Sequence, residues 1–137
     1  MSFGAWATNL TNAVRSYRLA LRASSYFGRS ITLRKTGQAR EALAVARQGL
    51  LLLGDPVVRR QAPPEGAGII SLTIQVEQLA EELGEPGAGE RDLRDAAEFL
   101  RAMPSSARGT AAQTQHDWLP YFEARLAALA EHGGPHE

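Results

Sequence analysis

The sequence of 137 residues contains no cysteine. Disulfide bonds, zinc sites built on thiolates and cysteine nucleophiles are therefore excluded together. No apolar run approaches the roughly 20 residues that a membrane-spanning helix needs. The first residues lack a basic region followed by an apolar run, so we expect no signal peptide and a cytoplasmic location. Arginine greatly outnumbers lysine, which favours a GC-rich bacterial genome.

Patterns typical of β-strands are also missing, because Val, Ile and Thr do not alternate with polar residues between turn signals. Instead, apolar residues recur at intervals of three and four, the spacing of amphipathic helices. The sequence therefore predicts one all-α domain over residues 1–137, with about five helices in antiparallel hairpins. The predicted helices cover residues 6–36, 38–53, 68–84, 90–103 and 112–132.

The first predicted helix is long, and we expect it to be continuous because its apolar series keeps one register throughout. We expect this series to face the second helix, and Phe3 and Trp6 to lie in the core. Pro120 fits the last helix only if it lies in the first turn. The apolar series consists of Trp6, Leu10, Ala13, Tyr17, Ala20, Ser24, Phe27 and Ile31.

The formal net charge of zero hides a division between the two halves of the chain. Residues 1–62 carry a net charge of +8, and residues 63–137 carry −8. Such asymmetry predicts either an acidic or polyanionic partner for the basic half, or two halves that fold against each other. Along the chain we expect a basic hairpin (1–55), a loop rich in Pro and Gly (56–67), acidic helices (68–132) and a frayed tail (133–137).

Four arginines of the first helix fall within about 60° of one another and lie about 120° from its apolar series. They are Arg15, Arg18, Arg22 and Arg29, called the basic stripe below. The stripe suits nucleic-acid phosphates, an anionic membrane, an acidic protein, the chain's own acidic helices or the acidic half of a second copy. Nucleic acid is disfavoured because the acidic half would repel a polyanion and common recognition motifs are absent. A membrane is disfavoured because we expect the apolar face to be covered by the second helix.

Ile70 and Ile74 form a second candidate contact for a partner. They lie on the side of the third predicted helix away from Leu72, among glutamates. Either that helix is buried on two sides, or this apolar pair is exposed and binds a partner.

Two stretches resemble the tetratricopeptide repeat, a helical hairpin used for protein binding. From Tyr26 the small residue Ser30 follows after four positions, and Gly37 stands at the turn before Ala42. Residues 13–21 resemble the second helix of such a repeat. Arg29 and Gly49 depart from the repeat's pattern, and the two stretches lie too close together to be tandem units. The resemblance implies helical hairpins and a protein-binding role for residues of about 13–56.

No pattern in the chain indicates catalysis. The glycine-rich segment 84–89 carries acidic residues that would repel phosphate. We interpret His116, His132 and His136 as solvated, so no metal or cofactor is expected. Glu77, Glu81, Glu82 and Glu85 are interpreted as a solvated helix face. The sequence therefore predicts a non-enzyme that acts as a protein-binding adaptor or scaffold, with a nucleic-acid-binding module or a small ligand-binding bundle as alternatives.

Overall fold

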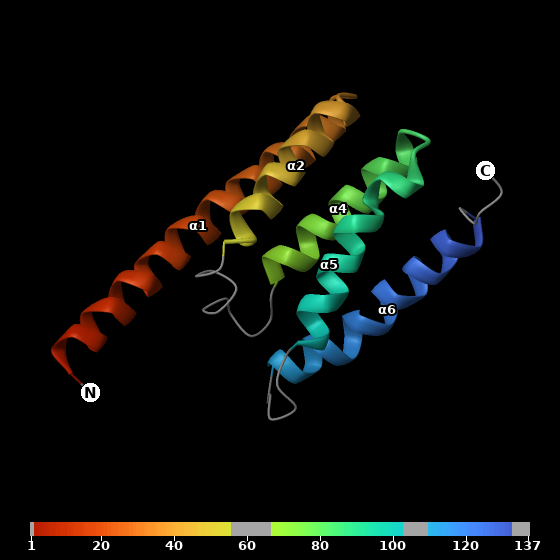
Figure 1. Cartoon of the computed structure of the whole chain (residues 1–137). Coiled ribbons are helices and arrows are strands. Elements are labelled where there is room, and N and C mark those ends of the chain that lie inside the picture. The colour runs from red at the N-terminus through yellow and green to blue at the C-terminus, as the bar shows by residue number, and fades with distance from the viewer. Residues whose placement is uncertain (1, 56–66, 103–109, 133–137) are drawn as a thin grey trace.

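The computed structural model describes residues 2–55, 67–102 and 110–132, and every structural statement below concerns these residues. They form five α-helices and one turn of 3₁₀-helix, with no strand, which confirms the predicted all-α class. Most of the predicted loop 56–67 and the predicted tail 133–137 lie outside the described residues. The elements are α1 (Phe3–Lys35), α2 (Ala39–Leu53), α4 (Ala67–Glu82), η1 (Pro86–Gly89), α5 (Glu90–Arg101) and α6 (Thr110–His132) (Figure 1).

Two glycines with positive φ set the ends of α1 and α4. Gly37 has φ of 81° and Gly84 has φ of 74°, a backbone region that favours glycine. After α1, the backbone N–H of Gln38 donates to the carbonyl of Leu33 at 2.9 Å and that of Gly37 to Arg34 at 3.2 Å. The same pair of bonds closes α4 around Gly84. These are Schellman motifs, which satisfy carbonyls that a helix end would leave free.

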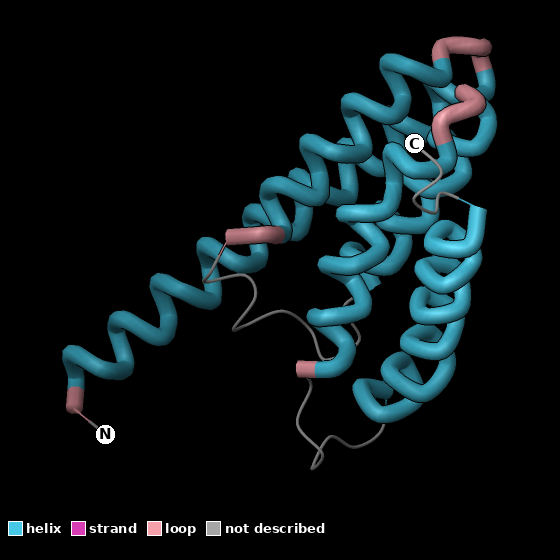
Figure 2. Tube along the Cα trace, turned by 45° about the vertical axis from the view of Figure 1, so that its right-hand side comes forward, coloured by secondary structure: helices cyan, strands magenta, loops and turns pink. Residues whose placement is uncertain are grey.

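Helix α4 lies at the centre of the bundle. It packs against α1 and α2 on one side and against α5 on the other. Figures 1 and 2 show the α1–α2 hairpin, then α4, then α5 and α6. The largest fully buried side chains come from α4, α5 and α6, so the core lies around α4. They include Leu72, Leu79, Leu93, Leu100 and Phe122.

Helix α1 is continuous, as predicted, but most of the predicted apolar series does not face the bundle, although Phe27 packs against the core. The side chains turned toward the bundle form an inner row, most of whose members come one position before a member of the predicted series. This row consists of Ser16, Leu19, Ala23, Tyr26, Ser30 and Leu33, of which Ser16, Ala23 and Ser30 are buried. Small residues repeated every seven positions let two helix backbones approach closely. Close approach therefore selects the inner row, although the neighbouring series is the more hydrophobic one.

Helix α6 corrects a second expectation, because it contains Pro120 well beyond its first turn. A proline inside a helix removes one backbone hydrogen bond and costs about 3 kcal/mol. Phe122 is fully buried beside it, and Trp118 and Leu119 pack against the core. Tertiary burial of this aromatic segment offsets the local cost, and the proline itself is exposed.

Candidate protein-docking surface

The N-terminal part of α1 extends past the end of α2 (Figure 2). One face of this helix exposes a row of large apolar side chains. Their exposed fractions run from 43% for Val14 to 81% for Phe3. At about 100° per residue the row occupies about 80° of the helix, on the side away from the inner row. We call it the outer row, and it consists of Phe3, Trp6, Leu10, Val14, Tyr17 and Leu21.

The outer row is exposed because it lies on the side of α1 opposite the inner row, and the first turns of α1 also extend past α2. Helix α2 has 15 residues against 33 in α1. The first turns of α1 therefore have no helix beside them within the described residues, and even their inner side is largely exposed. Phe3 and Trp6 contact each other, with ring centroids 5.9 Å apart. Both are exposed, so the prediction that they lie in the core is wrong. A row of six large exposed side chains is unusual for a surface that meets only water.

The arginines of the basic stripe border the outer row but have different partners. Arg15 donates to Asp55 with its Nη2 2.5 Å from Oδ2, and this hydrogen bond raises the pKa of Arg15. Arg29 lies over the ring of Tyr26, 5.6 Å from the centroid. Arg18 and Arg22 have no acidic partner within the described part of the chain. Within the described ranges, the charges of these two guanidinium groups are therefore not paired with the chain's own acids.

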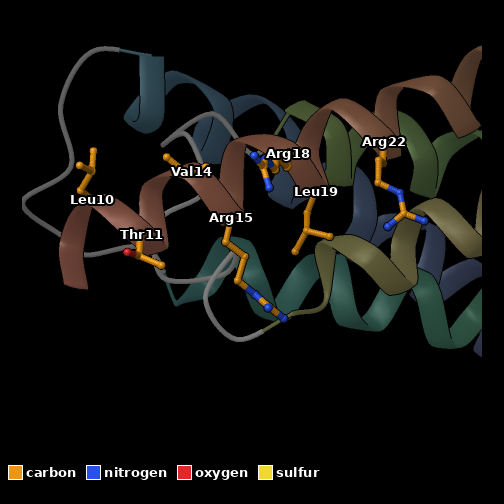
Figure 3. Close-up of a pocket in the computed structure, with 7 residues that line it drawn as sticks. All are labelled: Leu10, Thr11, Val14, Arg15, Arg18, Leu19 and Arg22. Carbon is orange, nitrogen blue, oxygen red and sulfur yellow. The ribbon is translucent and has the colours of Figure 1, made fainter. Parts of the chain in front are cut away.

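A hollow of about 760 Å³ lies along α1 on the side of the basic stripe, next to the outer row. Figure 3 shows Arg15 pointing away from Leu10 and Val14, while Leu19 lies between Arg15 and Arg22, so charged and apolar groups alternate along the hollow. The described residues that line it are Leu10, Thr11, Val14, Arg15, Arg18, Leu19 and Arg22. This combination offers both apolar contact and hydrogen-bond donors to whatever covers it.

Further arginines of the basic half pair with the acidic half. Arg34 donates to Glu82 at 2.7 Å and to Gln78 at 2.8 Å, both on α4. Arg40 meets Glu85 at 3.2 Å, and Arg47 lies 3.7 Å from Asp92 on α5. Folding of the two halves against each other, one of the alternatives left open by the charge division, therefore accounts for part of the basic charge. Among the described residues it does not account for Arg18 and Arg22.

Ile70 and Ile74 do not form an exposed pair. Ile70 is 5% exposed and belongs to the core, and Ile74 is half-buried and packs against it. Helix α4 has neighbours on both sides, so both of its apolar faces are covered. The first of the two alternatives for this helix is therefore correct, and Ile70 has almost no surface to offer a partner.

The sequence predicted that the glutamates of α4 form a solvated face, and this prediction is wrong for Glu77. Glu77 is only 6% exposed, and it accepts hydrogen bonds from the Tyr121 hydroxyl at 2.7 Å and from Arg125 Nε at 2.9 Å. Burial and the bond to Glu77 raise the pKa of Tyr121 to about 12. Arg125 also pairs with Glu81, and its bond to Glu77 raises its own pKa. The cluster joins α4 to α6 and has a structural role.

A groove of about 590 Å³ lies between α2, α4 and α5. Its lining includes Leu50, Ile69 and the buried hydroxyl of Thr73, which has no hydrogen-bond partner among the described residues. Arg91 and Asp95 stand on the α5 side of the groove. The mixed charges give the groove no preference for one class of ligand.

The described residues contain no group of three or more His, Asp or Glu side chains arranged to hold a metal ion. His116 is largely exposed and lies 3.2 Å from Asp117, while the side chains of His132 and His136 are not among those described. Within the described ranges, no helix is long and apolar enough to cross a membrane.

In comparisons with known proteins, no family model, no curated protein and no solved structure matches this chain.

Proposed function

We propose that this chain is a non-catalytic adaptor or scaffold that binds another protein through the outer row of α1. The observation that carries the proposal is the row itself, six large apolar side chains exposed along one helix face. Apolar surface gathered in one patch is characteristic of protein-binding sites, whereas single exposed apolar residues are ordinary. The tetratricopeptide-like hairpin suggested by residues of about 13–56 would be consistent with this role.

The composition of this surface favours protein over nucleic acid. Interfaces between proteins are rich in aromatic residues and arginine. The outer row contributes Phe3, Trp6 and Tyr17, and the basic stripe contributes Arg18 and Arg22 at its border. A nucleic-acid site would instead present cations with few large apolar groups between them.

The proposal is tested by retention of binding partners on the immobilised chain. Leu10→Asp with Tyr17→Asp places two charges within the outer row, while Leu51→Asp places one at an equally apolar, exposed position on α2. A partner that binds the wild type and Leu51→Asp but not the outer-row variant supports the proposal. The same partners on all three proteins would contradict it.

The contribution of the basic stripe is tested separately with Arg18→Glu and Arg22→Glu. If these arginines contact an acidic surface, the double variant weakens partner binding and reduces its dependence on salt. Binding of DNA or RNA at low salt, lost in the same variant, would favour a nucleic-acid-binding module instead.

A further inference from the structure

We infer that the partner of the outer row is the outer row of a second copy of this chain, with the two α1 helices antiparallel. This inference rests on the proposed function, because it takes the outer row as the docking surface and names its occupant. The resulting interface is isologous: one patch meets the same patch of the other copy across a two-fold axis.

The spacing of the outer row is self-complementary. When one copy of α1 is reversed about a point near residue 12, every apolar residue of the row meets another apolar residue. Phe3 faces Leu21, Trp6 faces Tyr17 and Leu10 faces Val14, and each pair occurs twice. Around the helix, Phe3 and Leu21 coincide, Trp6 and Tyr17 differ by about 20°, and Leu10 and Val14 differ by about 40°. The two residues of each pair therefore fall on one side of the seam. Such a seam has no polar side chain at its centre.

The shape of the molecule leaves room for this pairing. Helices α2 and α4 pack on the inner side of α1, opposite the outer row. Figure 2 shows the N-terminal part of α1 projecting from the bundle. Two copies therefore approach along their outer rows with the bundles on opposite sides and at opposite ends. The seam covers residues 3–21, about 27 Å at about 1.5 Å per residue.

The charges of α1 select the antiparallel direction. The first 40 residues contain no acid, so a parallel pair would place Arg15, Arg18 and Arg22 beside the same residues of the other copy. In the antiparallel pair the two sets of arginines extend toward opposite ends. The nearest ones, the two copies of Arg15, are then about 9 Å apart along the axis, close to the screening length at physiological salt.

The apolar area is sufficient for a modest dimer. Large aromatic side chains have about 150–250 Å² each, so the exposed fractions leave on the order of 600 Å² of outer-row surface per copy. A standard stable interface buries about 800 Å² per partner. We therefore expect a dimer that forms and dissociates with protein concentration.

The first measurement is mass in solution by sedimentation equilibrium over about two decades of protein concentration. The wild type and Leu51→Asp are expected to shift from monomer to dimer, and Leu10→Asp with Tyr17→Asp is expected to stay monomeric. Far-UV circular dichroism establishes that the variant remains folded, since Leu10 and Tyr17 are exposed. A wild type that is monomeric throughout, or a dimer that the variant retains, overturns the inference.

The direction of pairing is tested with engineered cysteines, for which the absence of native cysteine is an advantage. Phe3→Cys with Leu21→Cys places two thiols about 27 Å apart in one copy, too far for an internal disulfide. Mild oxidation should link position 3 of one copy to position 21 of the other, giving a covalent dimer. Phe3→Cys alone should not link, and its efficient linkage would show a parallel pair and overturn the antiparallel arrangement.

Salt separates this partner from the alternatives. Added salt screens the repulsion between arginines, so self-association should hold or strengthen between about 0.05 and 0.5 M salt. The alternative of a membrane surface is tested with anionic phosphatidylglycerol vesicles. If the chain does not dimerise but binds these vesicles, and if this binding weakens with salt and is lost in the outer-row variant, the partner of the outer row is a membrane surface and the second copy is wrong. If the chain stays monomeric but loses a protein partner in that variant, the second copy is wrong and the proposed function stands.

Discussion

Helix α4 and the first half of α1 are both apolar helices, yet they have opposite environments. Helix α4 has α1 and α2 on one side and α5 and α6 on the other, and its leucines and isoleucines are covered. The first half of α1 extends past α2, and the aromatic and aliphatic side chains of its outer row meet solvent. Burial is therefore decided by how many helices surround a segment, and hydrophobicity alone does not decide it. The half of α1 that lacks neighbours is the part of the molecule suited to gain one from another chain.

The largest expected difference between the two helices is in the free energy of unfolding that is lost when a leucine is replaced by alanine. Leu72→Ala in α4 removes a side chain that is 1% exposed and should lower the free energy of unfolding by about 3 kcal/mol. Leu10→Ala in α1 should change it by less than about 0.5 kcal/mol, because Leu10 is half exposed. Urea denaturation followed by circular dichroism measures both values, at low protein concentration so that association does not contribute. Equal losses would contradict the contrast between the helices.

A second contrast concerns arginine. Arg125→Met removes a partner of the buried carboxylate of Glu77 and should cost about 2 kcal/mol, since hydrogen bonds to buried charged groups are expensive to lose. Arg18→Met keeps the aliphatic stem and should be nearly neutral for stability. Adding Glu77→Gln to Arg125→Met should cost less than the sum of the two single changes, because the groups interact. Additive costs in this double-mutant cycle would contradict the role of the pair.

Smaller effects are expected from the serines of α1. The buried hydroxyl of Ser30 donates to the carbonyl of Ala42 at 2.7 Å and accepts from Gln75 Nε2 at 3.2 Å, so it joins α1, α2 and α4. Ser30→Ala leaves the amide of Gln75 buried without this partner and should cost about 1 kcal/mol. Ser24 lies on the exposed side, and Ser24→Ala should be neutral or slightly stabilising through helix propensity. Thermal unfolding of the two variants compares their stabilities. If Ser30→Ala leaves the stability unchanged, the Ser30 hydroxyl does not help to hold the three helices together.

The sequence predicted the helices well because their ends depend on local chemistry. Apolar intervals of three and four located each helix, and Gly37 and Gly84 stand where the chain needs positive φ. All of these signals lie within a few residues of the feature they specify. The basic stripe was also predictable, because the geometry of one helix fixes the angles between its side chains.

The environment of each face was harder to predict, because it depends on contacts far apart in the chain. Glu77 is buried by residues 44 and 48 positions away, and no local pattern pairs them. Ile70 and Ile74 were ambiguous until the number of helices around α4 was known. The inner row of α1 did carry a signal, the small residues Ser16, Ala23 and Ser30 at intervals of seven. A search for large hydrophobic residues overlooks it.

The smallest expected effect is a dependence of stability on pH. It can arise from carboxylates in the bundle around α4 but not from α1, because α1 contains no acid. Asp92 of α5 is partly buried, and this burial raises its pKa above the ordinary value, although the positive charge of Arg47 acts in the opposite direction. The folded state therefore binds this proton more tightly than the unfolded state does. The resulting contribution to stability is present below the unfolded pKa and is lost as the pH rises through the folded pKa. Ionised Asp92 is thus a small burden at neutral pH, only partly relieved by Arg47.

Asp92→Asn should remove that burden and raise the free energy of unfolding by up to about 0.5 kcal/mol at neutral pH. The gain should disappear near pH 3, where the wild-type carboxyl is protonated in both states. Asp117→Asn on α6 is the control, since Asp117 is half exposed and no buried position is changed. Urea denaturation at the two pH values distinguishes the outcomes. A variant that is less stable than the wild type at neutral pH would mean that attraction to Arg47 outweighs burial at this carboxylate.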